Sequence, residues 1–287
     1  MGLGQFLGRL LWLLGPRLKV VRQNLEMAFP GDDESAIRKR KDIEVNAYEH
    51  VANLFLEILM LLGPMKYFIT HKTKAVGYEN VKKAMDHGKG VIMLASHLGN
   101  WEIMAAKGGE QVGNVLMVTK RLKPKWLHRV IEQGRLQCGV TATYEPRTYK
   151  DILAQLKKGG TVGIVLDQYA GPPIGIRVPF FGCPVGTHSV VAVLAKRTGA
   201  AVVPVYNVMQ PDGTYIVCAE PEIPWIRDEN PSREIAVNTA HYSSLVEKKI
   251  YQSPEQWLWL HRRFKGDLSP LKPTEWEQFR VRRGHSD

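Results

Sequence analysis

The stretch that most constrains the fold of this chain is G-V-I-M-L-A-S-H-L-G-N-W-E at residues 90–102. Its five apolar residues, Val91 to Ala95, follow a glycine and form a short continuous run that predicts a buried β-strand. Residues 96–100 have the composition of a turn and a helix cap, and helical spacing of apolar residues begins at Trp101. His97 is therefore expected at a strand end, where open α/β sheets bind their ligands.

Glu102 lies five residues after His97. On one continuous helix this offset would leave the two side chains about 140° apart. If His97 lies in the loop and Glu102 in the first helical turn, the carboxylate can reach the imidazole, fix its tautomer and stabilise its protonated form. His97 would then be a general base toward an alcohol. The spacing also fits a capping histidine beside a surface glutamate, although His97 alone among the nine histidines has an acid at this offset.

Composition limits the partners of the chain. A formal net charge of +11 suits an acidic carrier protein, a phosphorylated lipid, an anionic membrane surface or a nucleic acid. No basic region has the pattern of a nucleic-acid module, so no nucleic-acid partner is expected. The three cysteines, Cys138, Cys183 and Cys218, are widely spaced and predict reduced thiols in a protein that faces the cytoplasm. Neither a metal nor a cofactor is expected.

The N-terminal region predicts contact with a membrane surface. Residues 3–14 are apolar but too short to span about 30 Å of hydrocarbon, and they lack the cleavage site of a signal peptide. With the cations that follow, residues 1–25 predict an interfacial helix with a basic flank, although an ordinary packing helix also fits. Residues 34–62 predict a long helix ending at Gly63-Pro64, and Asn53 and Glu57 in its apolar half argue against a membrane span.

From about residue 73, strands and helices alternate, which predicts one α/β domain over residues 1–287 with a mostly parallel mixed sheet flanked by helices. The expected strands are 74–77, 91–95, 115–119, 140–144 and 161–166, with a hairpin from 201–209 and 215–219. The expected helices are 79–87, 101–107 ending at Gly108-Gly109, 124–137, 150–158, 188–197 capped by Thr187, and 231–252. Residues 169–187 predict a long functional loop, and residues 265–287 a loosely ordered basic tail.

The segment from Ser96 to Glu102 resembles the signature of the late lipid A (lauroyl/myristoyl) acyltransferases, a branch of the lysophospholipid acyltransferase superfamily in which His is followed, after four residues, by Asp or Glu. Further stretches that resemble this family are K-R-L-K-P at 120–124 with G-R at 134–135, L-D-Q at 166–168, V-P-F-F-G at 178–182 and P-E-Q-W-L-W-L-H-R-R-F at 254–264. The resemblance covers nearly the whole chain. It implies a glycerol-phosphate acyltransferase-like fold at the cytoplasmic face of the inner membrane.

The same resemblance implies acyl transfer from a thioester, usually acyl carrier protein, to a hydroxyl of a membrane glycolipid. His97 and Glu102 are then the expected catalytic pair. The expected substrate-binding residues are Asn100, Arg121, Arg135, Asp167 and Gln168.

The expected roles follow from side-chain chemistry. A guanidinium matches phosphate geometry, which suits Arg121 and Arg135, and Asp167 can accept hydrogen bonds from a substrate or hold a basic neighbour. Gly99 and Asn100 are close enough to shape an oxyanion hole. Phe180 and Phe181 are predicted either to wall the acyl chain or to plug the core.

Several alternatives remain open at the level of sequence. The donor can be acyl-coenzyme A, and the acceptor another glycolipid or a lysophospholipid. A hydrolase whose His97 activates water, and a non-catalytic membrane lipid-binding protein, also fit. Absence of a G-x-S-x-G motif favours direct transfer over an acyl-enzyme. Trp257 and Trp259 are expected against the sheet or at a membrane interface, and residues 261–263 either at anionic groups or in a solvated turn.

Overall fold

The computed structural model describes residues 2–61, 65–272 and 279 of the chain. The predicted helix end at Gly63-Pro64 and most of the predicted basic tail lie outside these residues. In chain order the elements are α1 (Leu3–Leu14), α2 (Leu18–Ala28), α3 (Glu34–Leu61), α4 (Met65–Lys72), β1 (Thr73–Val76), α5 (Tyr78–Met85), β2 (Val91–Ala95), α6 (Trp101–Val112), β3 (Val115–Val118), α7 (Lys125–Gln137), β4 (Val140–Thr143), α8 (Thr148–Lys157), β5 (Thr161–Val165), β6 (Gly175–Phe180), β7 (Cys183–His188), α9 (Val190–Thr198), β8 (Ala201–Met209), β9 (Tyr215–Ala219) and α10 (Pro231–Gln252), followed by a 3₁₀ turn over Pro254–Gln256.

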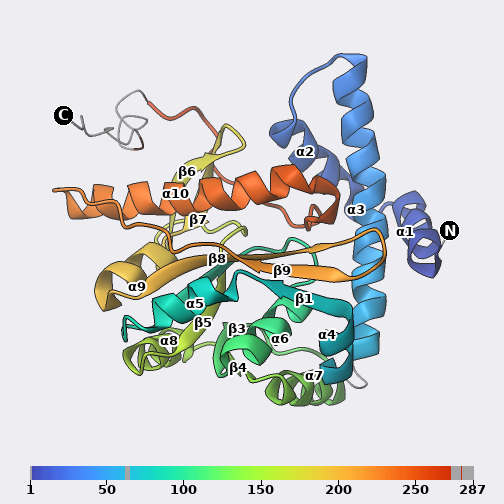
Figure 1. Ribbon diagram of the computed structural model, residues 1–287. Coiled ribbons are helices and arrows are strands. Elements are labelled where there is room, and N and C mark those ends of the chain that lie inside the picture. Colours follow the sequence, from blue (N-terminus) through green and yellow to red (C-terminus); the bar gives the residue numbers. More distant parts are fainter. Residues whose placement is uncertain (1, 62–64, 273–278, 280–287) are drawn as a thin grey trace.

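A seven-stranded sheet with the order β1-β9-β8-β2-β5-β3-β4 forms the centre of the molecule (Figure 1). Its neighbouring strands are parallel except for β8 and β9, which form the predicted antiparallel hairpin. The predicted fold class, a mostly parallel mixed sheet flanked by helices, is confirmed. Strand β2 lies between β8 and β5, and all five of its residues are buried, as expected for a strand covered on both faces.

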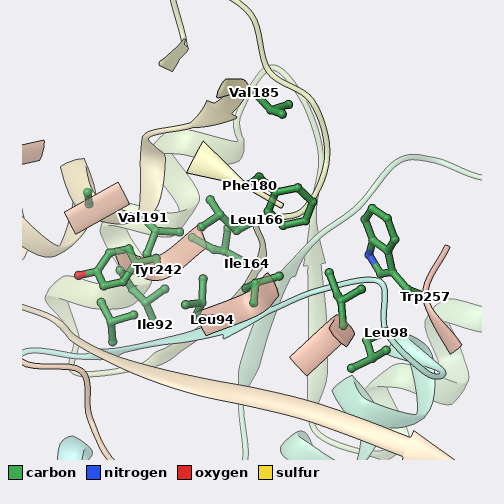
Figure 2. Packing of buried hydrophobic residues seen from close by; sticks show 14 of the residues in the cluster. Ile92, Leu94, Leu98, Ile164, Leu166, Phe180, Val185, Val191, Tyr242 and Trp257 are labelled. Carbon is green, nitrogen blue, oxygen red and sulfur yellow. The ribbon is translucent and has the colours of Figure 1, made fainter. Parts of the chain in front are cut away.

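Alternate residues of β2 point to opposite faces of the sheet, and each face has its own hydrophobic cluster. Ile92 and Leu94 belong to the cluster that includes residues of α8, α9 and α10 (Figure 2). Val91, Met93 and Ala95 belong to the other cluster, which includes residues of α5 and α6. The two layers of helices therefore hold β2 rigidly, and with it the loop that follows.

Three predictions about the elements were wrong. Helix α6 continues through Gly108-Gly109 to Val112, so these glycines do not end it. Glycine is needed at position 109 because a Cβ there would overlap the carbonyl oxygen of Cys138, in the turn before β4. Residues 169–187 are not one long loop, because they include the antiparallel pair β6 and β7. These strands meet at Phe181-Gly182, both with positive φ (49° and 73°), as a two-residue type I′ turn requires. Thr187 consequently lies in β7, and Ser189 is the N-cap of α9.

Helix α1 packs on α3 through its small residues. Gly4 and Gly8 are buried, and a Cβ at Gly8 would overlap the backbone of Glu49. The opposite face of α1 is apolar and exposed, with side chains of Leu3, Phe6, Leu10, Leu13 and Leu14. The predicted basic flank includes a second helix, α2, which exposes Lys19 and Arg22 and buries Val20, Val21 and Leu25. Within the described ranges, no helix combines the length and the apolar composition needed to cross a bilayer.

Candidate functional site

The candidate site begins where two neighbouring parallel strands end. Ala95 of β2 pairs with Val165 of β5, so the residues two positions further on, His97 and Asp167, come together. The Nδ1 atom of His97 lies 2.8 Å from Oδ1 of Asp167, and the His97 backbone N–H donates to Oδ2 at 2.7 Å. One carboxylate therefore fixes both the ring and the main chain of the histidine.

Asp167 is held as a buried anion. It is 2% exposed, and the indole N–H of Trp257 donates to its Oδ2 at 2.7 Å. Burial alone would raise the pKa of Asp167, but the imidazole of His97 and the donated hydrogen bonds outweigh it and lower the pKa to about 2. Of the two roles predicted for Asp167, the geometry gives the second: it holds a basic neighbour and is closed to substrate.

His97 presents its other ring nitrogen to a cavity. Because a carboxylate only accepts, Nδ1 carries the hydrogen and Nε2 of the neutral ring carries the lone pair. The Gln168 side-chain nitrogen lies 3.3 Å from Nε2, and Trp101 packs edge-on against the ring at 4.8 Å. Burial lowers the pKa of His97, but the Asp167 carboxylate outweighs it, so the net direction is upward. This imidazole is arranged to accept a proton at Nε2.

Glu102 lies in the first turn of α6 and lines the same cavity, as predicted, but its carboxylate is bound elsewhere. The Arg135 guanidinium donates to it in a bidentate pair, with Nη2 to Oε1 at 2.6 Å and Nε to Oε2 at 2.9 Å. In the described part of the chain, the predicted contact between Glu102 and the imidazole is not formed. The reason is that Asp167, on the adjacent strand end, already occupies Nδ1.

Three other predicted substrate-binding residues have different surroundings. Arg135 is 3% exposed and its charge is paired with Glu102, so it is not open to a phosphate. Asn100 is fully buried and caps α6 by accepting from the backbone N–H groups of Glu102 and Ile103 at 3.1 and 3.2 Å. Arg121 is exposed, with its guanidinium over the ring of Tyr144 at 5.1 Å.

The predicted oxyanion-hole role of Gly99 and Asn100 meets a further obstacle. The backbone N–H of Gly99 donates to the carbonyl of Gln256 at 2.9 Å and is therefore not free for a substrate oxygen. Gly99 has a φ of 66°, and a Cβ there would lie 2.5 Å from the Asn207 carbonyl oxygen. This glycine lets the loop turn tightly against β8.

A cavity of about 440 Å³ extends from His97 along the sheet beneath α6. Much of its apolar lining comes from alternate positions of neighbouring strands and from α6: Met93, Ala95, Met104, Ala105, Val115, Met117, Val165 and Val205. Its polar and aromatic lining includes His97, Trp101, Glu102, Lys120, Glu145, Thr148 and Gln168. Gly163 pairs with Met93 on one side and Met117 on the other, and an added Cβ there would meet open space. Apolar walls with a few polar groups are typical of ligand sites.

Phe180 and Phe181 do not line this cavity. Both are buried in the cluster on the opposite face of the sheet, and Figure 2 shows Phe180 beside Leu166. Phe181 packs edge-on against Phe29 at 5.7 Å. The prediction that these residues plug the core is the one that agrees with the structure, and the predicted acyl-pocket role is not supported, because the cavity at His97 lies on the other face of the sheet.

Residues 254–264 hold the segment around Asp167 in place, a role that was not predicted for them. Trp257 and Trp259 are 1% and 0% exposed and lie in the core, not at a membrane interface. Arg263 is fully buried and donates to the carbonyls of Gln168 and Gly186 at 3.2 and 2.7 Å. It clamps the segment after Asp167 onto β7, so residues 261–263 are not simply a solvated turn. The resemblance at 254–264 was the only sequence signal for these roles.

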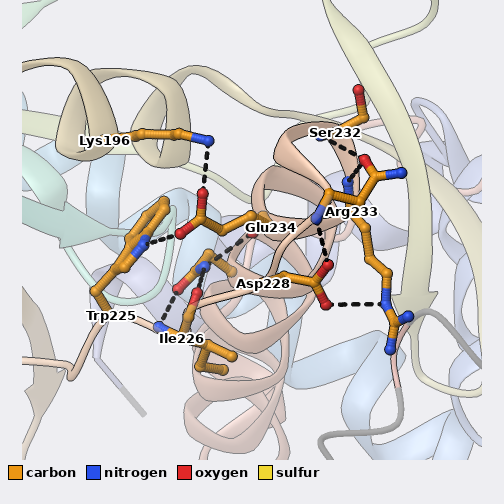
Figure 3. A network of polar contacts seen from close by, with 9 residues as sticks. Lys196, Trp225, Ile226, Asp228, Ser232, Arg233 and Glu234 are labelled. Atoms are coloured by element: carbon orange, nitrogen blue, oxygen red, sulfur yellow. Dashed lines mark hydrogen bonds and ion pairs between the residues drawn. The ribbon is translucent and has the colours of Figure 1, made fainter.

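A larger hollow of about 1000 Å³ lies among α9, α10 and β6. Three of its cations are already paired with acids: Arg177 with Asp267 at 3.1 Å, Lys196 with Glu234 at 2.5 Å, and Arg233 with Asp228 at 3.1 Å. Figure 3 shows the last two pairs where the segment before α10 joins that helix. These contacts tie structural elements together, so the cavity at His97 is the better candidate site.

Comparison with known proteins shows similarity over nearly the whole chain. Residues 2–266 match the family model described as bacterial lipid A biosynthesis acyltransferase. The chain is 29% identical over 270 residues to the lipid A biosynthesis lauroyltransferase of Escherichia coli (strain K12), covering 92% of this chain and 84% of that protein. It is 29% identical over 255 residues to the lipid A biosynthesis palmitoleoyltransferase of the same strain, covering 87% and 79%.

A more distant relative is the phosphatidylinositol mannoside acyltransferase of Mycolicibacterium smegmatis, with 25% identity over 197 residues that cover 68% of this chain and 63% of that protein. Among solved structures, a 1-acyl-sn-glycerophosphate acyltransferase from Thermotoga maritima matches with a TM-score of 0.43 and 14% identity, over 89% of this chain and 97% of that one.

Proposed function

This chain belongs to the bacterial lipid A biosynthesis acyltransferase family, and from that membership we propose that it moves a fatty acyl chain from acyl carrier protein to a hydroxyl of a membrane glycolipid such as a lipid A precursor. One observation carries the proposal: His97 turns Nε2 toward an apolar cavity while Asp167 holds Nδ1 at 2.8 Å. Acyl-coenzyme A as donor, and another glycolipid or a lysophospholipid as acceptor, are the alternatives.

In the proposed reaction, His97 Nε2 takes the proton of the acceptor hydroxyl as its oxygen attacks the thioester carbonyl carbon. The C–O bond forms, and the tetrahedral oxyanion collapses with cleavage of the C–S bond. The imidazolium then returns the proton to the departing thiolate. Asp167 stabilises the imidazolium, and general base catalysis of this kind contributes about 10²–10⁴-fold in rate.

We propose that Glu102 is also catalytic, although Asp167, and not Glu102, orients the imidazole of His97. Its carboxylate lines the cavity beside His97, and Arg135 fixes its position through two hydrogen bonds. From there it can accept a hydrogen bond from the acceptor sugar. Gln168, exposed at the same opening, remains a proposed substrate-binding residue.

The distribution of charge supports an acidic carrier protein as donor. Residues 111–131 contain no aspartate or glutamate, and they contain five exposed cations: Lys120, Arg121, Lys123, Lys125 and Arg129. Lys120 itself lines the cavity. A cluster of exposed cations near a site attracts a partner of opposite charge and orients its approach.

The exposed apolar face of α1 supports binding at a membrane surface. Leu3, Leu13 and Leu14 are 64–72% exposed, on a helix whose other face is fixed to α3. A helix of this kind lies in the lipid interface with its apolar side inserted. We place the enzyme at the cytoplasmic face of the inner membrane, where a carrier protein and a glycolipid can both reach it.

The test is transfer of a radiolabelled acyl group from acyl carrier protein to a tetraacylated, sugar-extended lipid A precursor, with acyl-coenzyme A as the comparison donor. We expect transfer by the wild type, and losses of about 10²–10⁴-fold in His97→Ala, because the general base is gone. Glu102→Ala is expected to lose transfer as well, while His241→Ala on α10 should retain it. Transfer sustained by His97→Ala would refute the mechanism, and an inactive wild type would remove this donor or acceptor.

A further inference from the structure

We propose that Glu57, on α3, is a positioning residue for the catalytic loop and acts through the side chain of Asn100. This inference rests on the function proposed above, because it concerns the same site. Glu57 does not line the cavity at His97. Its importance to the site comes from the hydrogen bonds that connect it to the first turn of α6.

Glu57 is a buried carboxylate with two neutral donors. It is 8% exposed, and its Oε2 accepts from Asn100 Nδ2 at 2.8 Å and from Tyr215 Oη at 2.7 Å. In the described part of the chain, Glu57 forms no ion pair. Burial raises its pKa, which reflects the cost of holding a carboxylate in this environment. A carboxylate kept at such a cost in stability calls for a role beyond packing.

The Asn100 amide connects this carboxylate to α6. Its Oδ1 accepts from the backbone N–H groups of Glu102 and Ile103, so Nδ2 must be the end that donates to Glu57. The amide orientation is therefore determined from both sides. Removing the Glu57 acceptor would free Asn100 to rotate and release the N-terminus of α6, which carries Glu102.

The contacts that α3 and β8 make with Gly99 and the main chain of Asn100 hold the backbone of the loop. His50, also on α3, donates from Nε2 to the Gly99 carbonyl at 3.2 Å, and Asn207 donates to the Asn100 carbonyl at 2.8 Å. Burial lowers the pKa of His50 to about 4, so this ring is neutral. Helix α3 thus contacts two consecutive loop residues. A displacement of about 1 Å in a catalytic group can cost about 10²-fold in rate.

The test exchanges the two groups. Asn100→Asp keeps the oxygen that caps α6 but replaces the donor to Glu57 with a second carboxylate, so we expect kcat to fall by about 10²-fold. Glu57→Gln keeps an oxygen that can accept from both donors and should cost little. The double variant Glu57→Gln/Asn100→Asp restores a donor and acceptor in reversed order, and its kcat should return close to that of the wild type.

Two readouts accompany the rate. KM for the acyl donor should change little in any of these variants, because Glu57 and Asn100 do not line the cavity. Hydrogen exchange at the amides of Glu102 and Ile103 should accelerate in Asn100→Asp and return to the wild-type rate in the double variant. Glu247→Ala is the matched control, because it removes another partly buried carboxylate, one that accepts from the Phe181 backbone.

The outcomes separate the two proposals. An inactive wild type counts against the proposed function. The positioning role of Glu57 is then still tested by the hydrogen-exchange rates of the Glu102 and Ile103 amides. A double variant as impaired as Asn100→Asp, in exchange and in kcat, would overturn the inference. So would loss of thermal stability in Asn100→Asp with kcat and exchange at residues 102–103 unchanged, because the role would then be only structural.

Discussion

The imidazole of His97 and the carboxylate of Asp167 form a pair in which each side chain determines the state of the other. The anion raises the pKa of the ring, and the ring helps to lower the pKa of the acid. Trp257 donates to the same carboxylate, which limits its rotation. At this scale the site is a base whose tautomer and orientation are fixed before any substrate binds.

A change of pH reports on this pair directly. The base must be neutral to accept a proton, so transfer should decline as pH falls through the pKa of His97. Asp167→Asn removes the charge that raises this pKa, so the acidic limb of kcat/KM should move to lower pH. The plateau rate should also fall, by about 10²–10⁴-fold, because the imidazolium loses its stabilising anion. The measurement is the pH profile of transfer by the wild type and the variant.

Glu102→Gln is the control for that profile. Its carboxylate is paired with Arg135 and does not contact the ring, so the substitution should leave the acidic limb where it is. If instead the limb shifts with Glu102→Gln and not with Asp167→Asn, the partner of His97 has been misassigned.

The sequence correctly predicted that His97 follows the end of a strand and that Glu102 lies in the first turn of a helix. Turn and cap residues act locally, so their pattern is readable from the sequence. The partner of His97 was not predicted correctly, since Asp167 lies 70 residues away and reaches it only through the pairing of β2 with β5. Strand order is a property of the whole chain. The same limitation hid the cavity lining, which is built from alternate residues of several strands.

At the scale of elements, the apolar runs between turn residues correctly predicted the parallel strands and the helices between them. The turn residues Pro211-Asp212-Gly213 correctly predicted the hairpin of β8 and β9. The β6–β7 hairpin was missed because its strands contain four residues, two prolines and two glycines, of the types that usually mark loops. Helix α6 was shortened for the same reason, at glycines whose function is close packing. In these cases tertiary contacts override local preference.

The contact between α1 and α3 gives a prediction about elements. A side chain at position 8 would overlap the backbone of Glu49, so Gly8→Val should displace α1 and destabilise the protein by about 1–3 kcal/mol. Thermal or urea unfolding of the purified protein measures this. Gly2→Val is the control, because a Cβ at Gly2 meets nothing within 4 Å. Equal stability of the two variants would show that α1 is not closely packed on α3.

At the scale of the whole molecule, apolar and charged surfaces are separated in a way that suits two partners. The exposed apolar residues lie on α1, and the exposed cations lie in residues 120–129, of which Lys120 lines the cavity. We expect the lipid to be met by the first surface and the donor by the second. Net charge of +11 adds a long-range attraction that salt weakens.

Membrane binding should depend on α1 and not on overall stability. Burying one leucine in an apolar environment is worth about 1.5–3 kcal/mol, so Leu10→Asp/Leu13→Asp should weaken binding to vesicles by at least about 10²-fold. The unfolding temperature should change little, because both side chains are exposed. Flotation with vesicles of mixed neutral and anionic lipid measures the partition. Ile37→Asp, which alters an exposed apolar residue of α3 outside this face, is the control; equal loss in the control would contradict the assignment.

Helix α3 connects these scales. Its residues Glu49 and Asn53 face α1, and its residues His50 and Glu57, on a neighbouring stripe, hold the loop of His97. A helix of 28 residues is about 42 Å long and does not bend easily. If α1 rests in the lipid surface, the height of the catalytic nitrogen above that surface is a constant of the fold. Acceptors would then be sorted by how far their hydroxyl groups stand out from the bilayer, before any contact with the sugar is made.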